Sequence, residues 1–267
     1  MKHPLLIAGL FVCLVVCGVD EPQEISPSPH TVSYTFDWQS EDAVIGDGSI
    51  TLQTDLGYEV VITSAYAIAY TVLMVECPDE EEPVDVPGMG QWLWELVTPR
   101  AAWAGHSYGN GNDAAIGVPH TEDIMEQEPV ELGRITVNPG SYCQFFYLVG
   151  RADSVTVGLP EELDLSGLSI YLAGTYRSPE GEPQDFEIYT TRAYALISDL
   201  YAPGDYAQSE KAFELDTGTQ GAAVTVTRNL DRLFDGVDFE TMNTDQQATR
   251  VLTQLIDHAE LSVTLTP

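Results

Sequence analysis

Three histidines are the residues of this chain best suited to bind a transition metal. His106 lies in, and His120 just after, a segment rich in Gly and Asn, while His258 lies near the C-terminus. Imidazole nitrogens are the commonest protein ligands for zinc and copper, and three of them suffice for a site. Their spacing matches no metal-binding motif, so the alternative is two loop histidines in water and one capping a helix. We therefore expect no cofactor and keep copper or zinc binding by these three histidines as the alternative hypothesis.

Ser107 stands in a second pattern that could carry chemistry, G-x-S-x-G over residues 105–109. In a hydrolase Ser107 would be the nucleophile and His258 its base, and Asp231 or Asp257 would orient that base. The motif works only on a sharp turn from an apolar strand into a helix. Here Asn and Gly follow it, and strands do not alternate with helices elsewhere. We therefore expect a protein that is not an enzyme, with a serine hydrolase as the alternative.

The N-terminal segment indicates export. Met1-Lys2-His3 is a short positive head, and residues 4–16 form an uncharged apolar run. A permanent membrane-spanning helix needs roughly 20 apolar residues, so a run of this length predicts a cleaved signal peptide instead. We place the signal peptide at residues 1–16.

Leu14-Val15-Val16-Cys17-Gly18 resembles the lipobox of bacterial lipoproteins, with Leu three residues before a Cys and Gly after it. The resemblance implies that Cys17 carries acyl chains such as palmitate, which anchor the protein to a lipid membrane. Gly18 carries no retention signal, which implies the outer membrane of a Gram-negative bacterium. The alternative is an ordinary secretory signal with incidental cysteines. Residues 17–30, rich in Pro, Glu and Ser, are then a flexible tether.

Composition limits the partners. The formal net charge of the 267 residues is −32 at pH 7. Nucleic acids and anionic lipid surfaces attract Lys and Arg, so so acidic a chain excludes a nucleic-acid partner. The length allows one large domain, which we place at residues 31–267. A protein or small-ligand partner stays unidentified.

Cys77 and Cys143 are the two cysteines left once Cys13 and Cys17 are assigned to the signal and the anchor. An even remainder in an oxidising compartment predicts one disulfide. A metal site built on either cysteine would need a nearby His or second Cys, and neither has one.

Period-two alternation of apolar and polar residues dominates the domain and predicts β-strands, beginning at residues 31–38. Further strands are predicted at 58–62, 65–76, 130–137, 142–149, 168–176, 185–189, 222–228 and 261–265, with residues 192–200 open between strand and helix. One helix is predicted after Asn243, where Gln246 completes a capping box and His258 ends the helix. We interpret the aspartates at 231, 235, 238 and 245 as a solvated turn. Short strands with one late helix predict an antiparallel β-sandwich-like domain with a C-terminal α-helix.

Residues 57–66, 139–142, 231–238 and 257–261 resemble segments of uncharacterised exported bacterial lipoproteins. More distantly, the chain is similar to the copper-associated periplasmic family that accompanies methanobactin uptake. The resemblance implies an extracytoplasmic, β-rich binding protein and carries no metal-ligand pattern to this chain. We therefore expect a membrane-anchored cell-envelope lipoprotein that acts as a binding or structural module.

Overall fold

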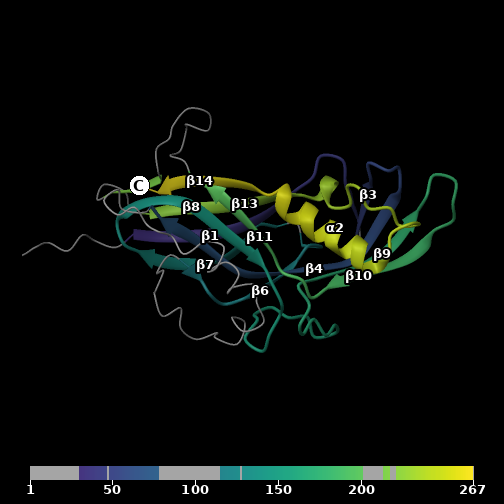
Figure 1. Cartoon of the computed structure of the whole chain (residues 1–267), viewed down its shortest axis with the longest axis horizontal. Helices are drawn as coiled ribbons and strands as arrows, with labels where there is room; N and C mark the ends of the chain where they lie inside the picture. Colours follow the sequence, from purple (N-terminus) through teal and green to yellow (C-terminus); the bar gives the residue numbers. More distant parts are fainter. Residues whose placement is uncertain are drawn as a thin grey trace, which may run out of the picture.

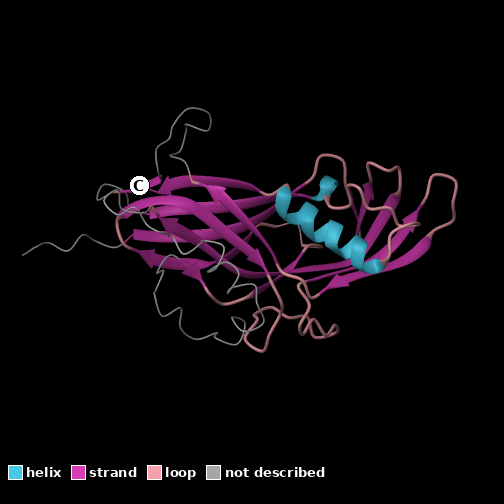
Figure 2. Ribbon diagram, viewed as in Figure 1, coloured by secondary structure: helices cyan, strands magenta, loops and turns pink. Residues whose placement is uncertain are grey.

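The computed structural model describes residues 30–46, 48–77, 115–126, 128–200, 213–216 and 221–266, which form two β-sheets and one α-helix (Figures 1 and 2). The prediction of a mainly β, antiparallel sandwich-like fold with a helix near the C-terminus is confirmed. Within these residues no helix is long and apolar enough to cross a membrane.

The first sheet has four strands. In spatial order they are β14 (Glu260–Thr266), β13 (Gly221–Asn229), β1 (His30–Gln39) and β7 (Val130–Val137). β1 alternates buried and exposed residues along its length, as its sequence pattern requires. It begins at His30, one residue before the predicted start of the domain, and that histidine is buried. β1 pairs with β13 in parallel, an exception in a fold whose other strand pairs are antiparallel.

The second sheet is larger and is organised around one long strand, β4 (Glu59–Glu76). One edge of β4 pairs with β9 (Ile170–Arg177) and β8 (Gly140–Val149), which extend to β10 (Gln184–Thr190), β11 (Tyr194–Asp199) and β12 (Phe213–Leu215). The other edge pairs with β3 (Ser49–Gln53), β5 (Ala115–Ile116) and β6 (His120–Asp123), and β2 (Val44–Gly46) continues from β3.

β4 joins the two halves of the molecule. Sequence patterns predicted two strands here, but the structure has one strand of 18 residues, about 55 Å long, that continues through a register shift between Ile62 and Ser64. Its second half faces the first sheet, where Phe145 of β8 packs against Tyr34 of β1 with ring centroids 6.3 Å apart. Its first half extends beyond the sandwich, with β9, β10 and β3 (Figure 1).

Helix α2 (Thr244–Asp257) covers the extended half and packs on β10 and β11 (Figure 2). The predicted capping box is confirmed, because the Asn243 side chain accepts from the Gln246 amide and the Gln246 side chain accepts from the Asn243 amide. A 3₁₀ turn, η2 (Leu230–Arg232), precedes it. Under this cover lies an aromatic cluster with centroid separations of 4.5–5.9 Å, made of Tyr58, Tyr176, Phe186, Phe234 and Phe239.

The two ends of the molecule differ in what they carry. At the near end, as we name it, β1 begins and β14 ends, because Thr31 and Thr266 both pair with Gly221. The far end carries the turns at residues 54–58 and 178–183, which close the β3–β4 and β9–β10 hairpins (Figure 1). A chain entering at His30 is therefore attached at the opposite end from these turns.

Candidate functional site

A buried ion pair lies between the two sheets. Arg228 of β13 and Glu122 of β6 are 1% and 2% exposed. The guanidinium donates from Nη1 to Oε1 of Glu122 at 2.9 Å and from Nη2 to Oε2, so the pair is bidentate. The Tyr147 hydroxyl of β8 accepts from Nη1 at 2.9 Å and donates to the same carboxylate at 3.2 Å.

Aromatic rings close this network from the sides. The guanidinium carbon of Arg228 lies 4.4 Å from the ring centre of Phe36 and 4.3 Å from that of Trp38, both on β1. Cation–π attraction is strengthened in such a water-free site. Burial raises the pKa of Tyr147 well above its ordinary value, so the hydroxyl keeps its proton and donates to Glu122. Because protein groups enclose the pair on each side, we assign it to positioning the sheets rather than to ligand binding.

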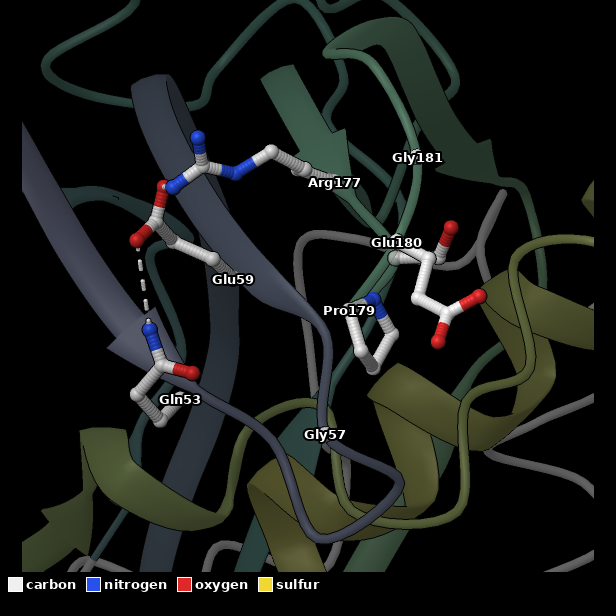
Figure 3. Close-up of a pocket in the computed structure, with 8 residues that line it drawn as sticks. Gln53, Gly57, Glu59, Arg177, Pro179, Glu180 and Gly181 are labelled. Atoms are coloured by element: carbon white, nitrogen blue, oxygen red, sulfur yellow. Dashed lines mark hydrogen bonds and ion pairs between the residues drawn. The ribbon is translucent and has the colours of Figure 1, made fainter.

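A polar pocket of about 330 Å³ lies at the far end, formed where three strands and two turns meet (Figure 3). Its lining is Gln53, Gly57, Glu59, Arg177, Ser178, Pro179, Glu180 and Gly181. Strand register places Glu59 of β4 opposite both Gln53 of β3 and Arg177 of β9. The guanidinium accordingly lies 2.6 Å from the Glu59 carboxylate, and the Gln53 amide donates to it at 3.5 Å.

The turns shape the opposite wall of this far-end pocket. Figure 3 shows Pro179 and Glu180 across from the Glu59 and Arg177 side chains. Gly57 has a φ of 84°, a conformation that favours glycine, and a Cβ there would lie 3.5 Å from the Pro179 ring. The pocket thus offers a guanidinium, an amide and two carboxylates, suited to a small polar group. The sequence marked the turn at residues 55–57, but nothing local linked it to Arg177.

The structure places two of the three predicted metal ligands. His120 is half-buried on β6, and burial lowers its pKa although the Glu122 charge opposes this. His258 is exposed at the C-terminus of α2. His106 and Ser107 lie outside the described residues, so copper or zinc binding and the serine hydrolase stay predictions. In the described part of the chain no three His, Cys, Asp or Glu residues gather as metal ligands would.

The aspartates before α2 are not the solvated turn that we expected. Asp231 accepts from the Ser40 hydroxyl and from the backbone amides of Glu41 and Ala43, at 2.5–3.0 Å, and so fixes the loop after β1. Asp238 accepts from the Tyr58 hydroxyl at 2.8 Å and from Thr241. These carboxylates organise the loops around the aromatic cluster. Asp257, the other acid considered for a triad, accepts from Tyr194 at 3.2 Å.

Acid should weaken the fold through these carboxylates. Hydrogen bonds from Thr241 and Tyr58 lower the pKa of Asp238 to about 2, and hydrogen bonds from Ser40 and three backbone amides outweigh burial to lower the pKa of Asp231. A lowered folded-state pKa means that the stabilisation is complete above the unfolded value of about 3.9 and is lost as pH falls toward 2. Urea midpoints measured from pH 7 to pH 2 should therefore fall less steeply for Asp238→Asn than for the unmodified protein.

Asp185→Asn is the control for that experiment, because Asp185 is exposed on the edge strand β10. Its pH profile should match that of the unmodified protein. An Asp238→Asn profile as steep as the unmodified one would show that this carboxylate does not contribute to acid sensitivity.

The predicted disulfide is confirmed: Cys77, directly after β4, is bonded to Cys143 of β8. It closes a loop between residues 66 positions apart in the chain. The amide of Cys77 also donates to the Ser141 carbonyl at 2.8 Å, so the covalent bond reinforces a continuing strand pair at the near end.

Comparisons with known proteins identify no family for the chain. No protein-family model matches it, and no curated protein matches it. Among solved structures it is similar to MbnP from Methylosinus trichosporium, with 10% sequence identity and a TM-score of 0.35, over 90% of this chain and 99% of that one. This is a distant structural likeness, too low for an inference about function.

Proposed function

We propose that this protein is a lipid-anchored protein of the bacterial cell envelope that acts by binding rather than by catalysis. The Cys77–Cys143 disulfide is the observation that carries the proposal. Disulfides persist in oxidising compartments and are rare in the cytosol of mesophiles. Together with the signal-like segment at residues 1–16, the disulfide supports a folded domain outside the cytoplasm.

The direction of the domain supports the anchoring half of the proposal. Cys17 lies thirteen residues before His30, where β1 begins at the near end. The far-end pocket then lies at the other end of β4, about 55 Å away along the strand. A protein held at the near end therefore presents Glu59 and Arg177 away from the membrane. We place the anchor in the outer membrane because Gly18 follows Cys17.

Cys17→Ser tests the anchor. The full-length chain is produced in a Gram-negative bacterium supplied with alkyne-tagged palmitate, and the membranes are separated by density. The unmodified protein should carry the tag, lose residues 1–16 and sediment with the outer membrane. Cys17→Ser should lose the tag and the membrane association, because no other thiol occupies the lipobox-like position. Cys13→Ser is the matched control and should be tagged as strongly as the unmodified protein.

A tag that persists in Cys17→Ser would contradict the assignment of the anchor. Free Cys77 and Cys143 thiols in the protein as isolated, shown by alkylation without reduction and intact mass, would contradict export. The two readouts are independent, so each half of the proposal stands or falls alone.

A further inference from the structure

Three of the arginines lack a carboxylate partner and lie close together. Of the seven arginines in the described residues, four form ion pairs with Asp or Glu. The others are Arg151, Arg192 and Arg250. Arg151 donates to the carbonyl of Thr191, next to Arg192, and both Arg192 and Arg250 line one pocket. In a chain with 42 acidic residues, unpaired cations gathered in one place need an explanation.

The pocket lies along the exposed side of α2, which we name the α2 pocket. Its volume is about 470 Å³, and its lining is Arg192, Met242, Asn243, Asp245, Gln246, Thr249, Arg250 and Thr253. Arg192 reaches it from the segment between β10 and β11 and donates to the Thr249 hydroxyl at 3.0 Å. Arg250 comes from the helix itself, one residue on from Thr249, and makes no ion pair among the described residues.

The capping box makes this pocket rich in hydrogen-bond donors. The side-chain oxygens of Asn243 and Gln246 both accept from backbone amides at the start of α2, at 3.0 Å. Their NH₂ groups, which can only donate, have no hydrogen bond within the described residues. The backbone amides themselves are used by the box, so the donors available to a ligand are side chains: two amides and two guanidinium groups.

Local charge favours an anion despite the acidic chain. Asp245 is the one carboxylate in the lining of the α2 pocket, against two guanidinium groups. Asp257, near the other end of α2, accepts from Tyr194. More distant carboxylates act weakly, because the screening length at physiological ionic strength is about 8 Å. Guanidinium forks match the geometry of carboxylate and phosphate oxygens, which makes arginine the usual residue for binding either.

We propose that the α2 pocket is a binding site for an oxyanion, either a carboxylate or a phosphate group, held by Arg192 and Arg250 with the amides of Asn243 and Gln246. The site is separate from the far-end pocket and does not depend on the anchor. Its failure would therefore leave the proposed function standing, and the converse also holds.

Titration of the full-length protein with inorganic phosphate and with acetate, at constant ionic strength, tests the site. The Nε–Hε NMR signals of the arginines report binding residue by residue. The signals of Arg192 and Arg250 should shift with saturation for at least one anion, and the anion bound more tightly identifies the group. Arg192→Gln and Arg250→Gln should each weaken binding at least tenfold, since each removes charge-assisted hydrogen bonds.

Arg134→Gln is the matched control, because Arg134 is an exposed arginine paired with Glu131 on β7 and its loss changes the net charge equally. Binding in this variant should stay within twofold of the unmodified protein. Linear, unsaturated shifts with both anions would overturn the proposal. Equal weakening in Arg134→Gln and the pocket variants would also overturn it, since that pattern reports overall charge rather than a site.

Discussion

The Glu122→Gln variant is expected to unfold with about 3–5 kcal/mol less free energy than the unmodified protein, the usual cost of removing one partner from a buried ion pair. Gln has the shape of Glu but leaves the Arg228 guanidinium uncompensated in a site where both side chains are almost fully buried. Urea unfolding should show a lower midpoint with an unchanged slope.

Two further variants separate the ion pair from general damage. Adding Arg228→Met to Glu122→Gln should recover part of the loss, because the double variant buries no net charge. Glu131→Gln, which breaks the exposed pair with Arg134 on β7, should leave the urea midpoint unchanged. A Glu122→Gln midpoint equal to that of Glu131→Gln would show that the pair is not buried as the structure has it.

Loss of the disulfide should have an effect of similar size. Cys77 and Cys143 are 66 positions apart, and releasing a loop of that length costs roughly 4 kcal/mol through the entropy of the unfolded chain. The double variant Cys77→Ala, Cys143→Ala should therefore lower the urea midpoint of the mature protein by that amount. It should also become insensitive to reducing agent.

Reduction of the unmodified protein is the matched comparison for this double variant. The reduced protein and the double variant should unfold at nearly the same urea concentration, because both lack the cross-link. If the unmodified protein unfolds at the same midpoint with and without reductant, the disulfide does not stabilise the fold.

The two effects act at different places along β4. The disulfide ties the end of β4 to β8 at the near end, whereas Glu122, on a strand paired with the middle of β4, reaches across to the first sheet. Because the two sites share no partner, we expect their losses to add when the variants are combined.

Features encoded by a few neighbouring residues were predictable. Alternation over residues 31–38 predicted β1, and Asn243 with Gln246 predicted the start of α2, because side-chain periodicity and capping act within one strand or one helical turn. The Cys77–Cys143 disulfide followed from there being two cysteines left to pair. The anchor at Cys17, the histidine metal site and the Ser107 hydrolase depend on residues outside those that the structure describes.

Strand partners and side-chain clusters were decided by tertiary structure. Alternation shows which residues of β1 and β13 face inward, but not that the two strands pair in parallel. Arg228 meets Glu122 across 106 positions, and Asp231 meets Ser40 across 191. Arg192 joins Arg250 in the α2 pocket only because α2 packs against β10 and β11. Such contacts arise when distant segments bury their apolar faces together, a process that local periodicity drives without specifying the partner.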